Sequence, residues 1–276
     1  MPRARWKWVA TLLLLTSVGL VLWWALVCEQ NFTRHCSRGG TYKIGDRTYT
    51  LPDVPVKNAE GLALGRFKIL DEKFLLRQRS LMEHVDRLLH THNVEYFVSG
   101  GTLMGFTMPG LESIMPHDDD LDVHVDVKHR AYLWSSRFAR HAAEHGIEAV
   151  YFRMASLKHA TREGAAVRLR FQGTQMPVLD VFFETLHDGK WKKIDGWTKR
   201  NKFSLNGKEQ WEPDWVYPIQ RREVDGLTLN LPANPQAMLQ KQYGNSVHKQ
   251  FVIPHHMVSH AFPYLAFGRA VWRVGR

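Results

Sequence analysis

Four aspartates lie close together near the middle of the chain: Asp118, Asp119, Asp120 and Asp122. Carboxylates crowded in this way repel one another strongly unless a cation lies among them. Residues Leu121 to Val127 alternate apolar and polar side chains, which predicts a strand with Asp118, Asp120 and Asp122 facing the same way. Hard oxygen ligands on one face are what Mg²⁺ or Mn²⁺ requires. The alternative, a solvated acidic loop, agrees less well with the apolar segments on both sides.

A further aspartate, Asp180, interrupts the apolar run from Val178 to Phe183. A single carboxylate is costly to bury in such a strand unless it is paired or binds a metal. If this strand lies beside the acidic strand, Asp180 completes a cluster of three carboxylates. The alternative is an aspartate that caps a turn at the end of the strand.

A Gly-Gly turn precedes the aspartates, in the segment Ser99-Gly100-Gly101-Thr102. It follows a predicted strand and begins a predicted helix. Glycines let the backbone approach a phosphate, and a helix N-terminus offers N–H groups and the positive end of its dipole. Such turns are common on their own, but before an acidic strand this one predicts a phosphate site at Gly100, Gly101 and Thr102.

These residues need a scaffold of strands and helices, which the hydrophobic pattern predicts as a mixed α/β (α+β) domain. A hairpin is expected over 41–51, helices over 62–92, 130–145 and 235–243, and strands over 94–99, 121–127, 147–152, 166–171 and 178–183. A basic hairpin region runs from Lys190 to Lys202 and includes Lys192 and Lys193. We interpret it as solvated, because charge runs usually are, with a grip on a phosphorylated glycan or lipid headgroup as the alternative.

Together these motifs resemble the LicD-type branch of the nucleotidyltransferase fold, which includes bacterial phosphocholine transferases and the fukutin-related proteins. The matching segments are Gly100 to Gly105, Pro116 to Asp122, Asp180 and Leu231 to Gly244. The sequence departs from the family pattern at His117, where Trp is usual, and at Met108, where Arg is frequent. The resemblance implies a nucleotidyltransferase-like mixed sheet flanked by helices.

The resemblance also implies an activity, the transfer of a phosphorylated group from a nucleotide-diphosphate donor to a glycan hydroxyl. The group is phosphocholine, a phosphoalditol or a phosphosugar, and the donor is CDP- or GDP-linked. Asp118, Asp120 and Asp122 are assigned to Mg²⁺ or Mn²⁺, and Asp180 to closing the site and activating the acceptor hydroxyl. Arg168 and Arg170 are candidates for the donor phosphates, with surface charge on an edge strand as an equal alternative.

The N-terminal region predicts a membrane anchor. Residues 8–27 carry no charge and are long enough to cross a bilayer, and Arg3, Arg5 and Lys7 precede them. This predicts a type II protein of the Golgi or ER membrane, with a cytosolic tail (1–7), an anchor (8–27), a stem (28–60) and a lumenal catalytic domain (61–276). A cleaved signal peptide is the alternative.

Composition and charge limit the classes of partner that this chain can bind. The 276 residues are 44% hydrophobic with a net charge of +10, which excludes a disordered chain and favours an anionic partner. A lumenal domain disfavours nucleic acid. The two cysteines, Cys28 and Cys36, exclude a disulfide-built framework and leave a bond between them or across a homodimer open.

Two other functions remain open on the sequence. One is an Asp-x-Asp nucleotide-sugar glycosyltransferase, which the Gly-Gly turn and the later Asp180 disfavour. The other is a non-catalytic membrane partner of a glycan-modifying enzyme, against which the intact set of aspartates counts.

Overall fold

The structure is a computed structural model, and it describes the greater part of the chain. The described residues are 16–19, 33–37, 39–51, 53, 56–57, 63–64, 66–152, 166–193, 209–245, 247 and 251–252. Within them, no helix is both long enough and apolar enough to cross a membrane. Of the predicted anchor, 8–27, only 16–19 are described, so the anchor and its topology remain predictions.

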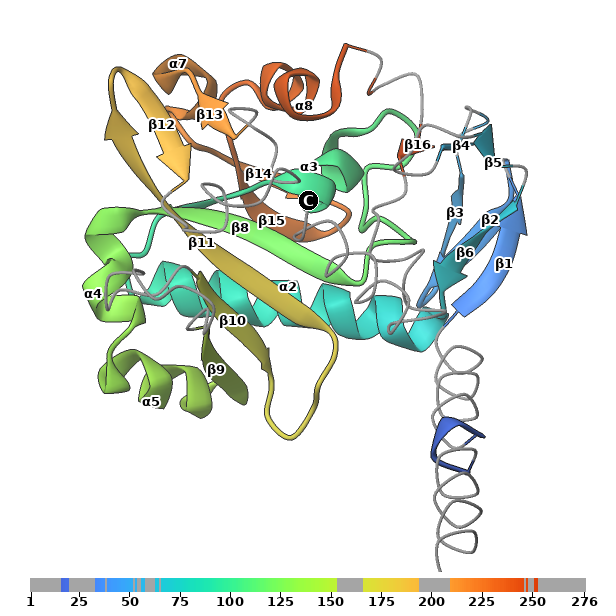
Figure 1. Cartoon of the computed structure of the whole chain (residues 1–276), viewed down its shortest axis with the longest axis horizontal. Coiled ribbons are helices and arrows are strands. Elements are labelled where there is room, and N and C mark those ends of the chain that lie inside the picture. The colour runs from blue at the N-terminus through green and yellow to red at the C-terminus, as the bar shows by residue number, and fades with distance from the viewer. Residues whose placement is uncertain are drawn as a thin grey trace, which may run out of the picture.

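A mixed sheet forms the centre of the described fold (Figure 1). Its strands are β7 (Tyr96–Val98), β8 (Asp120–Asp126), β9 (Ile147–Phe152), β10 (Ala166–Phe171), β11 (Val178–His187), β12 (Lys190–Lys193) and β13 (Gln210–Trp211). Strand β8 pairs with β11 in parallel and with β7 antiparallel. Strands β10 and β12 pair antiparallel with different ends of β11, and β9 and β13 extend the sheet beyond them.

Helix α2 (Glu72–Thr91) lies along one face of this sheet and contacts β8, β10 and β11 (Figure 1). Asp71 caps the N-terminus of the helix, because its side chain accepts a hydrogen bond from the Phe74 amide at 2.7 Å. Leu75, Met82 and Val85 on its apolar face are fully buried. Alternate residues of β8, Val123 and Val125, are also fully buried, which leaves the other side of the strand for its aspartates.

The remaining helices are short. They are α3 (Gly100–Thr107), η1 (Val127–His129), α4 (Arg130–Leu133), α5 (Ser136–Glu144), α7 (Pro213–Val216) and α8 (Pro235–Tyr243). Helix α3 connects β7 to the acidic segment and contacts both β8 and α8. The N-terminus of α3 is therefore held against the strand that carries the aspartates.

Smaller sheets surround the central one. They are β1 (Thr33–Ser37) with β6 (Arg66–Leu70), β2 (Thr41–Ile44) with β3 (Arg47–Thr50), β14 (Gln220–Val224) with β15 (Leu227–Leu231), and β16 (Phe251–Val252) with β4 (Val56–Lys57) and β5 (Ala63–Leu64).

Asp225, in the turn between β14 and β15, connects several of these elements. Its carboxylate accepts hydrogen bonds from Arg47 at 2.6 Å, Arg79 at 2.6 Å, Ser113 at 2.7 Å and the Tyr49 hydroxyl. The Asp225 side chain is only 3% exposed. We call these five residues the Asp225 cluster. It fastens the β2–β3 hairpin and the loop after α3 to helix α2.

Most of the predicted elements are confirmed, and three need correction. The helix expected over 62–92 begins only at Glu72, because residues 66–70 form β6 and Asp71 caps the helix. The helix expected over 130–145 is divided into α4 and α5, because the Ser135 side chain caps a new helix by accepting from the Phe138 amide. The strand expected over 178–183 extends to His187.

Candidate functional site

The pairing of β8 with β11 brings the predicted site aspartates together. Asp122 lies directly opposite Asp180 in the parallel register, and Asp120 lies opposite Val178. Oxygens of Asp120, Asp122 and Asp180 all lie within 4.8 Å of one another. The condition stated for Asp180, a strand beside the acidic strand, is therefore met, and the turn-capping alternative is wrong.

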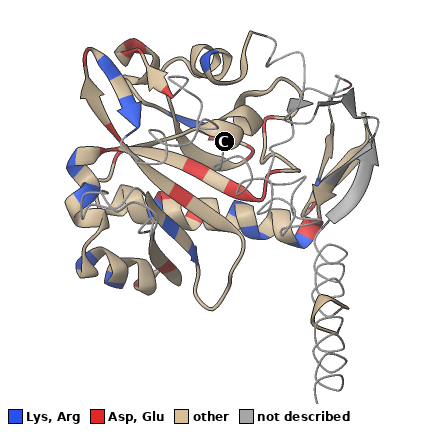
Figure 2. Cartoon of the chain, in the orientation of Figure 1, with Lys and Arg blue, Asp and Glu red and all other residues tan. Residues whose placement is uncertain are grey.

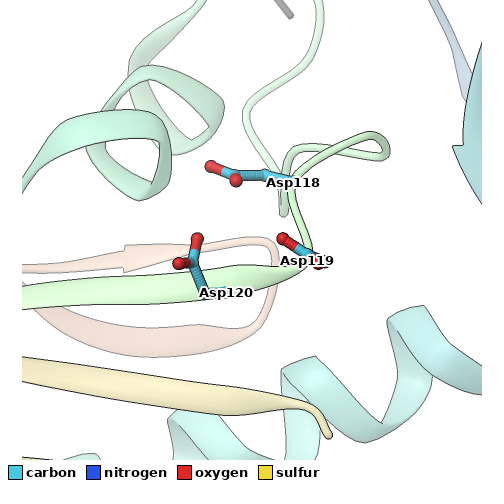
Figure 3. Close-up of side chains that lie close together, drawn as sticks. All are labelled: Asp118, Asp119 and Asp120. Atoms are coloured by element: carbon cyan, nitrogen blue, oxygen red, sulfur yellow. The ribbon is translucent and has the colours of Figure 1, made fainter. Parts of the chain in front are cut away.

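A second group of carboxylates adjoins the first. Oxygens of Asp118, Asp119 and Asp120 also lie within 4.8 Å of one another, and Figure 3 shows the Asp118 side chain reaching over the strand toward that of Asp120. Asp120 belongs to both groups. We call the five aspartates (118, 119, 120, 122 and 180) the acidic centre. Figure 2 shows acidic positions, in red, along the neighbouring strands β8 and β11.

The Gly-Gly turn makes room for this centre. Gly100 has a φ of +57°, and a Cβ atom there would lie 2.7 Å from Asp122 Oδ2. A Cβ atom on Gly101 would lie only 1.8 Å from Asp118 Oδ2. Any larger side chain at either position would displace a carboxylate. The two glycines thus allow the N-terminus of α3 to approach the acidic centre closely.

Thr102 and Ser99 attach the turn to the acidic strand. The Thr102 hydroxyl accepts a hydrogen bond from the Asp122 amide at 2.8 Å, and the Ser99 amide donates to the Asp122 carbonyl at 3.1 Å. Thr102 is buried, so its side chain fixes the strand. The phosphate-binding role predicted for Gly100, Gly101 and Thr102 remains a prediction, at a position next to the carboxylates.

The side chain of Gln78, on α2, forms a hydrogen bond to the loop that carries Asp118. Its Nε2 donates to the Asp118 carbonyl at 2.8 Å, and its side chain is fully buried. The sequence analysis did not identify Gln78. A signal for it existed, because Gln78 lies one helical turn from both Leu75 and Leu81 on the apolar face of α2, where a polar side chain is unusual.

Arg168 lies at the edge of the acidic centre. Its Nε and Nη2 atoms donate to the two oxygens of Asp180 at 2.7 and 2.6 Å, a bidentate pair. The hydrogen bond to Asp180 raises the pKa of the Arg168 guanidinium, against the opposing effect of burial. Arg170 instead donates to Glu148 at 3.0 Å and to Gln175 at 2.5 Å. Strand β10 is paired on both sides, so the edge-strand alternative for these arginines is wrong.

The like charges of the centre leave a clear electrostatic effect on Asp122. Burial, and then repulsion from Asp118 and Asp180, raise the pKa of Asp122 from 3.8 to about 7, although Lys193 and His124 oppose the rise. In the absence of a cation, Asp122 therefore holds a proton through the acidic and into the neutral pH range. A divalent cation among these oxygens would oppose the shift, because it stabilises the ionised carboxylate.

Two residues beyond the predicted set interact electrostatically with the centre. Tyr243, at the end of α8, has its pKa raised well above the usual range by burial and then by the charges of Asp118 and Asp122. Lys193 of β12 lies with its ammonium 3.5 Å from the centroid of the Phe182 ring. The sequence analysis interpreted the region of Lys193 as a solvated hairpin. For this residue that interpretation is wrong, because its side chain is only 10% exposed.

Comparison with known proteins identifies the family. No curated protein sequence matches the chain. Among solved structures, the lincosamide antibiotic adenylyltransferase LnuA with lincomycin bound is 12% identical over 66% of this chain and 94% of that chain, with a TM-score of 0.36. The antibiotic-resistance factor ANT(2'')-Ia is also 12% identical, over 71% of this chain and 91% of that chain, with a TM-score of 0.35.

These structural similarities are too distant to carry an argument about function. The family model described as "LicD/FKTN/FKRP, nucleotidyltransferase domain" matches residues 93–234, more than half of the chain. That span includes β7, the Gly-Gly turn, the whole acidic centre and Arg168. The chain belongs to the LicD/FKTN/FKRP nucleotidyltransferase-domain family.

Proposed function

We propose that this chain transfers a phosphorylated group from a nucleotide-diphosphate donor to a glycan hydroxyl, with Mg²⁺ or Mn²⁺ bound by its aspartates. Membership of the family supports a transferase, and the arrangement of the site supports the finer proposal. The observation that carries it is the position of Asp120, which belongs to both carboxylate groups next to the N-terminus of α3.

The donor set of the acidic centre fits a hard divalent cation. Every candidate ligand is a carboxylate oxygen, and no more than 4.8 Å separates the oxygens within each group. The raised pKa of Asp122, caused by burial and by its neighbours Asp118 and Asp180, is the cost of bringing these charges together without a cation. When bound, the cation would neutralise charge on the diphosphate and orient it for displacement.

The chain's own residues would hold the donor. The N-terminus of α3, the positive end of its dipole, lies against the acidic centre, where the two glycines allow a close approach. Arg168, already beside the centre, can contact a phosphate oxygen while it keeps one of its two hydrogen bonds to Asp180. Arg170 faces Glu148, so we assign it a supporting role.

Asp180 orients the site in this proposal. Both of its oxygens accept hydrogen bonds from Arg168, which fixes the carboxylate against Asp122. To accept the proton of the acceptor hydroxyl, Asp180 must give up one of these bonds as the donor draws Arg168 away. The acceptor is a glycan or glycoprotein, and we propose that the domain faces the lumen of the Golgi or ER behind the anchor at 8–27.

The experiment is a titration of CDP-, GDP- and UDP-linked donors into the full chain by calorimetry, with and without Mn²⁺. We expect metal-dependent binding of one donor class, weakened by about a hundredfold or more in Asp120→Asn, because a central ligand is lost. Asp126→Asn is the matched control. Asp126 lies on the same strand and face, but its side chain accepts from the Lys128 amide at 2.9 Å, outside the acidic centre.

The alternatives give different results. A nucleotide-sugar glycosyltransferase would form a glycosidic bond, so its product would resist treatment that cleaves phosphodiesters. If no donor binds with Mn²⁺ present, the proposal is wrong and a non-catalytic membrane partner of a glycan-modifying enzyme becomes the better account.

A further inference from the structure

Lys193 differs from the other lysines of its strand. Lys190 and Lys192 have side chains that are 43% and 26% exposed, and they pair with Glu212 at 3.0 Å and Asp188 at 2.9 Å. The Lys193 side chain is only 10% exposed. A lysine carries its charge on a flexible four-carbon stem and usually extends it into water. The burial of Lys193 is therefore a property of this position, imposed by its surroundings.

The Lys193 ammonium lies over the face of the sheet, next to side chains of β11. Its cross-strand neighbour in the ladder is Glu184, whose Oε1 contacts His124 and accepts from Trp211 at 2.9 Å. The Lys193 ammonium lies instead over the Phe182 ring, 3.5 Å from its centroid, a favourable cation–π position. Phe182 lies on β11 two residues after Asp180, on the same face.

Lys193 places a positive charge on the face of the sheet that carries the acidic centre, because its partner in the ladder, Glu184, and the ring beneath its ammonium, Phe182, both share that face with Asp180. The ion pair of Lys193 with Glu209 is 3.5 Å long, well beyond the roughly 2.8 Å of a close charge-assisted hydrogen bond. Lys193 is thus a nearly buried cation that lies over the Phe182 ring, on the same face of the sheet as Asp180.

We propose that Lys193 binds the phosphate oxygens of the donor diphosphate, on the side of the acidic centre that adjoins β12. The inference rests on the proposed function, because it assigns Lys193 to the same donor. Arg168 approaches the centre from β10 and Lys193 from β12, and these two strands pair with different ends of β11. A diphosphate over the aspartates would therefore meet one cationic side chain from each strand.

The test uses the full chain as wild type and as Lys193→Ala, Lys193→Arg and Lys192→Ala. Calorimetry measures the affinity for Mn²⁺ alone, for a preformed Mn²⁺–CDP complex and for a preformed Mn²⁺–pyrophosphate complex. Pyrophosphate is included because it presents the phosphates without base or sugar. Lys192 is the matched control, since it is adjacent on the same strand but pairs with Asp188.

We expect Lys193→Ala to weaken both phosphate complexes by a similar factor, about tenfold or more, which is typical of a lost charge-assisted hydrogen bond. Mn²⁺ alone should bind at least as tightly as to wild type, because a positive charge has been removed from beside the aspartates. Lys193→Arg should retain most of the affinity, and Lys192→Ala should match wild type. A merely structural role of Lys193 would not weaken the affinity for the phosphate complexes while leaving the affinity for Mn²⁺ unchanged or higher.

Three results would overturn the assignment: unchanged affinity for both complexes, a parallel loss of Mn²⁺ and phosphate binding, or a loss confined to CDP. If wild type itself binds neither complex, the proposed function and this inference both fail. If wild type binds both complexes and Lys193→Ala binds them equally well, only this inference fails.

Discussion

The Asp225 cluster and the acidic centre both contain buried carboxylates, but their charges are balanced in different ways. In the first, a single buried carboxylate receives hydrogen bonds from two arginines and two hydroxyl groups. In the second, five carboxylates gather, and the basic side chains that act on them include Arg168, Lys193 and His124. The first arrangement is complete without any ligand. The second carries excess negative charge, which is the property expected of a cation site.

The largest effect should come from Asp225→Ala. Removing the buried carboxylate leaves Arg79 with only the Asp225 carbonyl as an acceptor among the described residues and releases the β2–β3 hairpin and the loop at Ser113. We expect the free energy of unfolding to fall by about 3 kcal/mol or more, as for other buried ion pairs that lose one member. Urea denaturation measures it. A loss below about 1 kcal/mol, the usual limit for surface pairs, would show that the cluster is not a structural fastener.

Gly101→Ala should damage the acidic centre with little effect on global stability. The new methyl group would overlap Asp118 Oδ2, so that carboxylate must turn away from its neighbours. We expect affinity for Mn²⁺ to fall by about tenfold to a hundredfold, as for other changes that misplace a ligand. Gly173→Ala is the control, because Gly173 has a φ of +71° and nothing lies within 4 Å of its Cβ position. Equal Mn²⁺ affinity in Gly101→Ala and wild type would contradict the placement of Asp118.

Arg168→Met and Arg170→Met separate the two candidate arginines. They lie on the same strand and face, yet only Arg168 contacts an aspartate of the centre. We expect Arg168→Met to weaken Mn²⁺-dependent donor binding about tenfold, through the loss of a charged contact and of the support for Asp180. Arg170→Met should change it less than threefold, within the usual effect of a surface pair. Calorimetry with one donor measures both, and equal losses would contradict the distinction.

The smallest effect concerns pH. Burial and like charges raise the pKa of Asp122 to about 7 in the folded chain, from an ordinary value of 3.8. The folded state therefore binds this proton more tightly than the unfolded state. Its contribution to the free energy of unfolding is fully present below about pH 4 and is lost as pH rises through about 7. Asp122→Asn should flatten this part of the profile and, above pH 7 without metal, stabilise the chain by on the order of 1 kcal/mol. A profile unchanged by the substitution would be contrary evidence.

The local chemistry of the site could be predicted from the sequence because it resides in short segments. The alternation of 121–127 and the apolar run around Asp180 each specify a strand, and two adjacent strands of one sheet bring their aspartates together. The glycines were predicted to admit a phosphate, whereas the structure places carboxylates against them. That contact depends on how closely α3 packs on β8, and the local sequence does not indicate this packing distance.

The residues missed by the sequence analysis depend on long-range packing. Gln78 is marked by its polar side chain on the apolar face of α2, but the local sequence does not indicate that this face lies under the acidic loop, and nothing near Lys193 indicates its burial. The start of α2 was misplaced for a related reason. Residues 66–70 carry apolar side chains at spacings that suit a helix, but pairing with β1 and the cap at Asp71 favour a strand there.

The most direct test of the comparison is thermal unfolding of wild type, Asp120→Asn and Asp126→Asn at pH 8, with and without Mn²⁺. If the acidic centre is a cation site strained by its own charges, Mn²⁺ raises the melting temperature of wild type and of Asp126→Asn. Asp120→Asn then melts higher than wild type without metal and responds little to it. If Mn²⁺ shifts none of the three, and Asp120→Asn is less stable than wild type, the aspartates serve the fold and the account of the site is wrong.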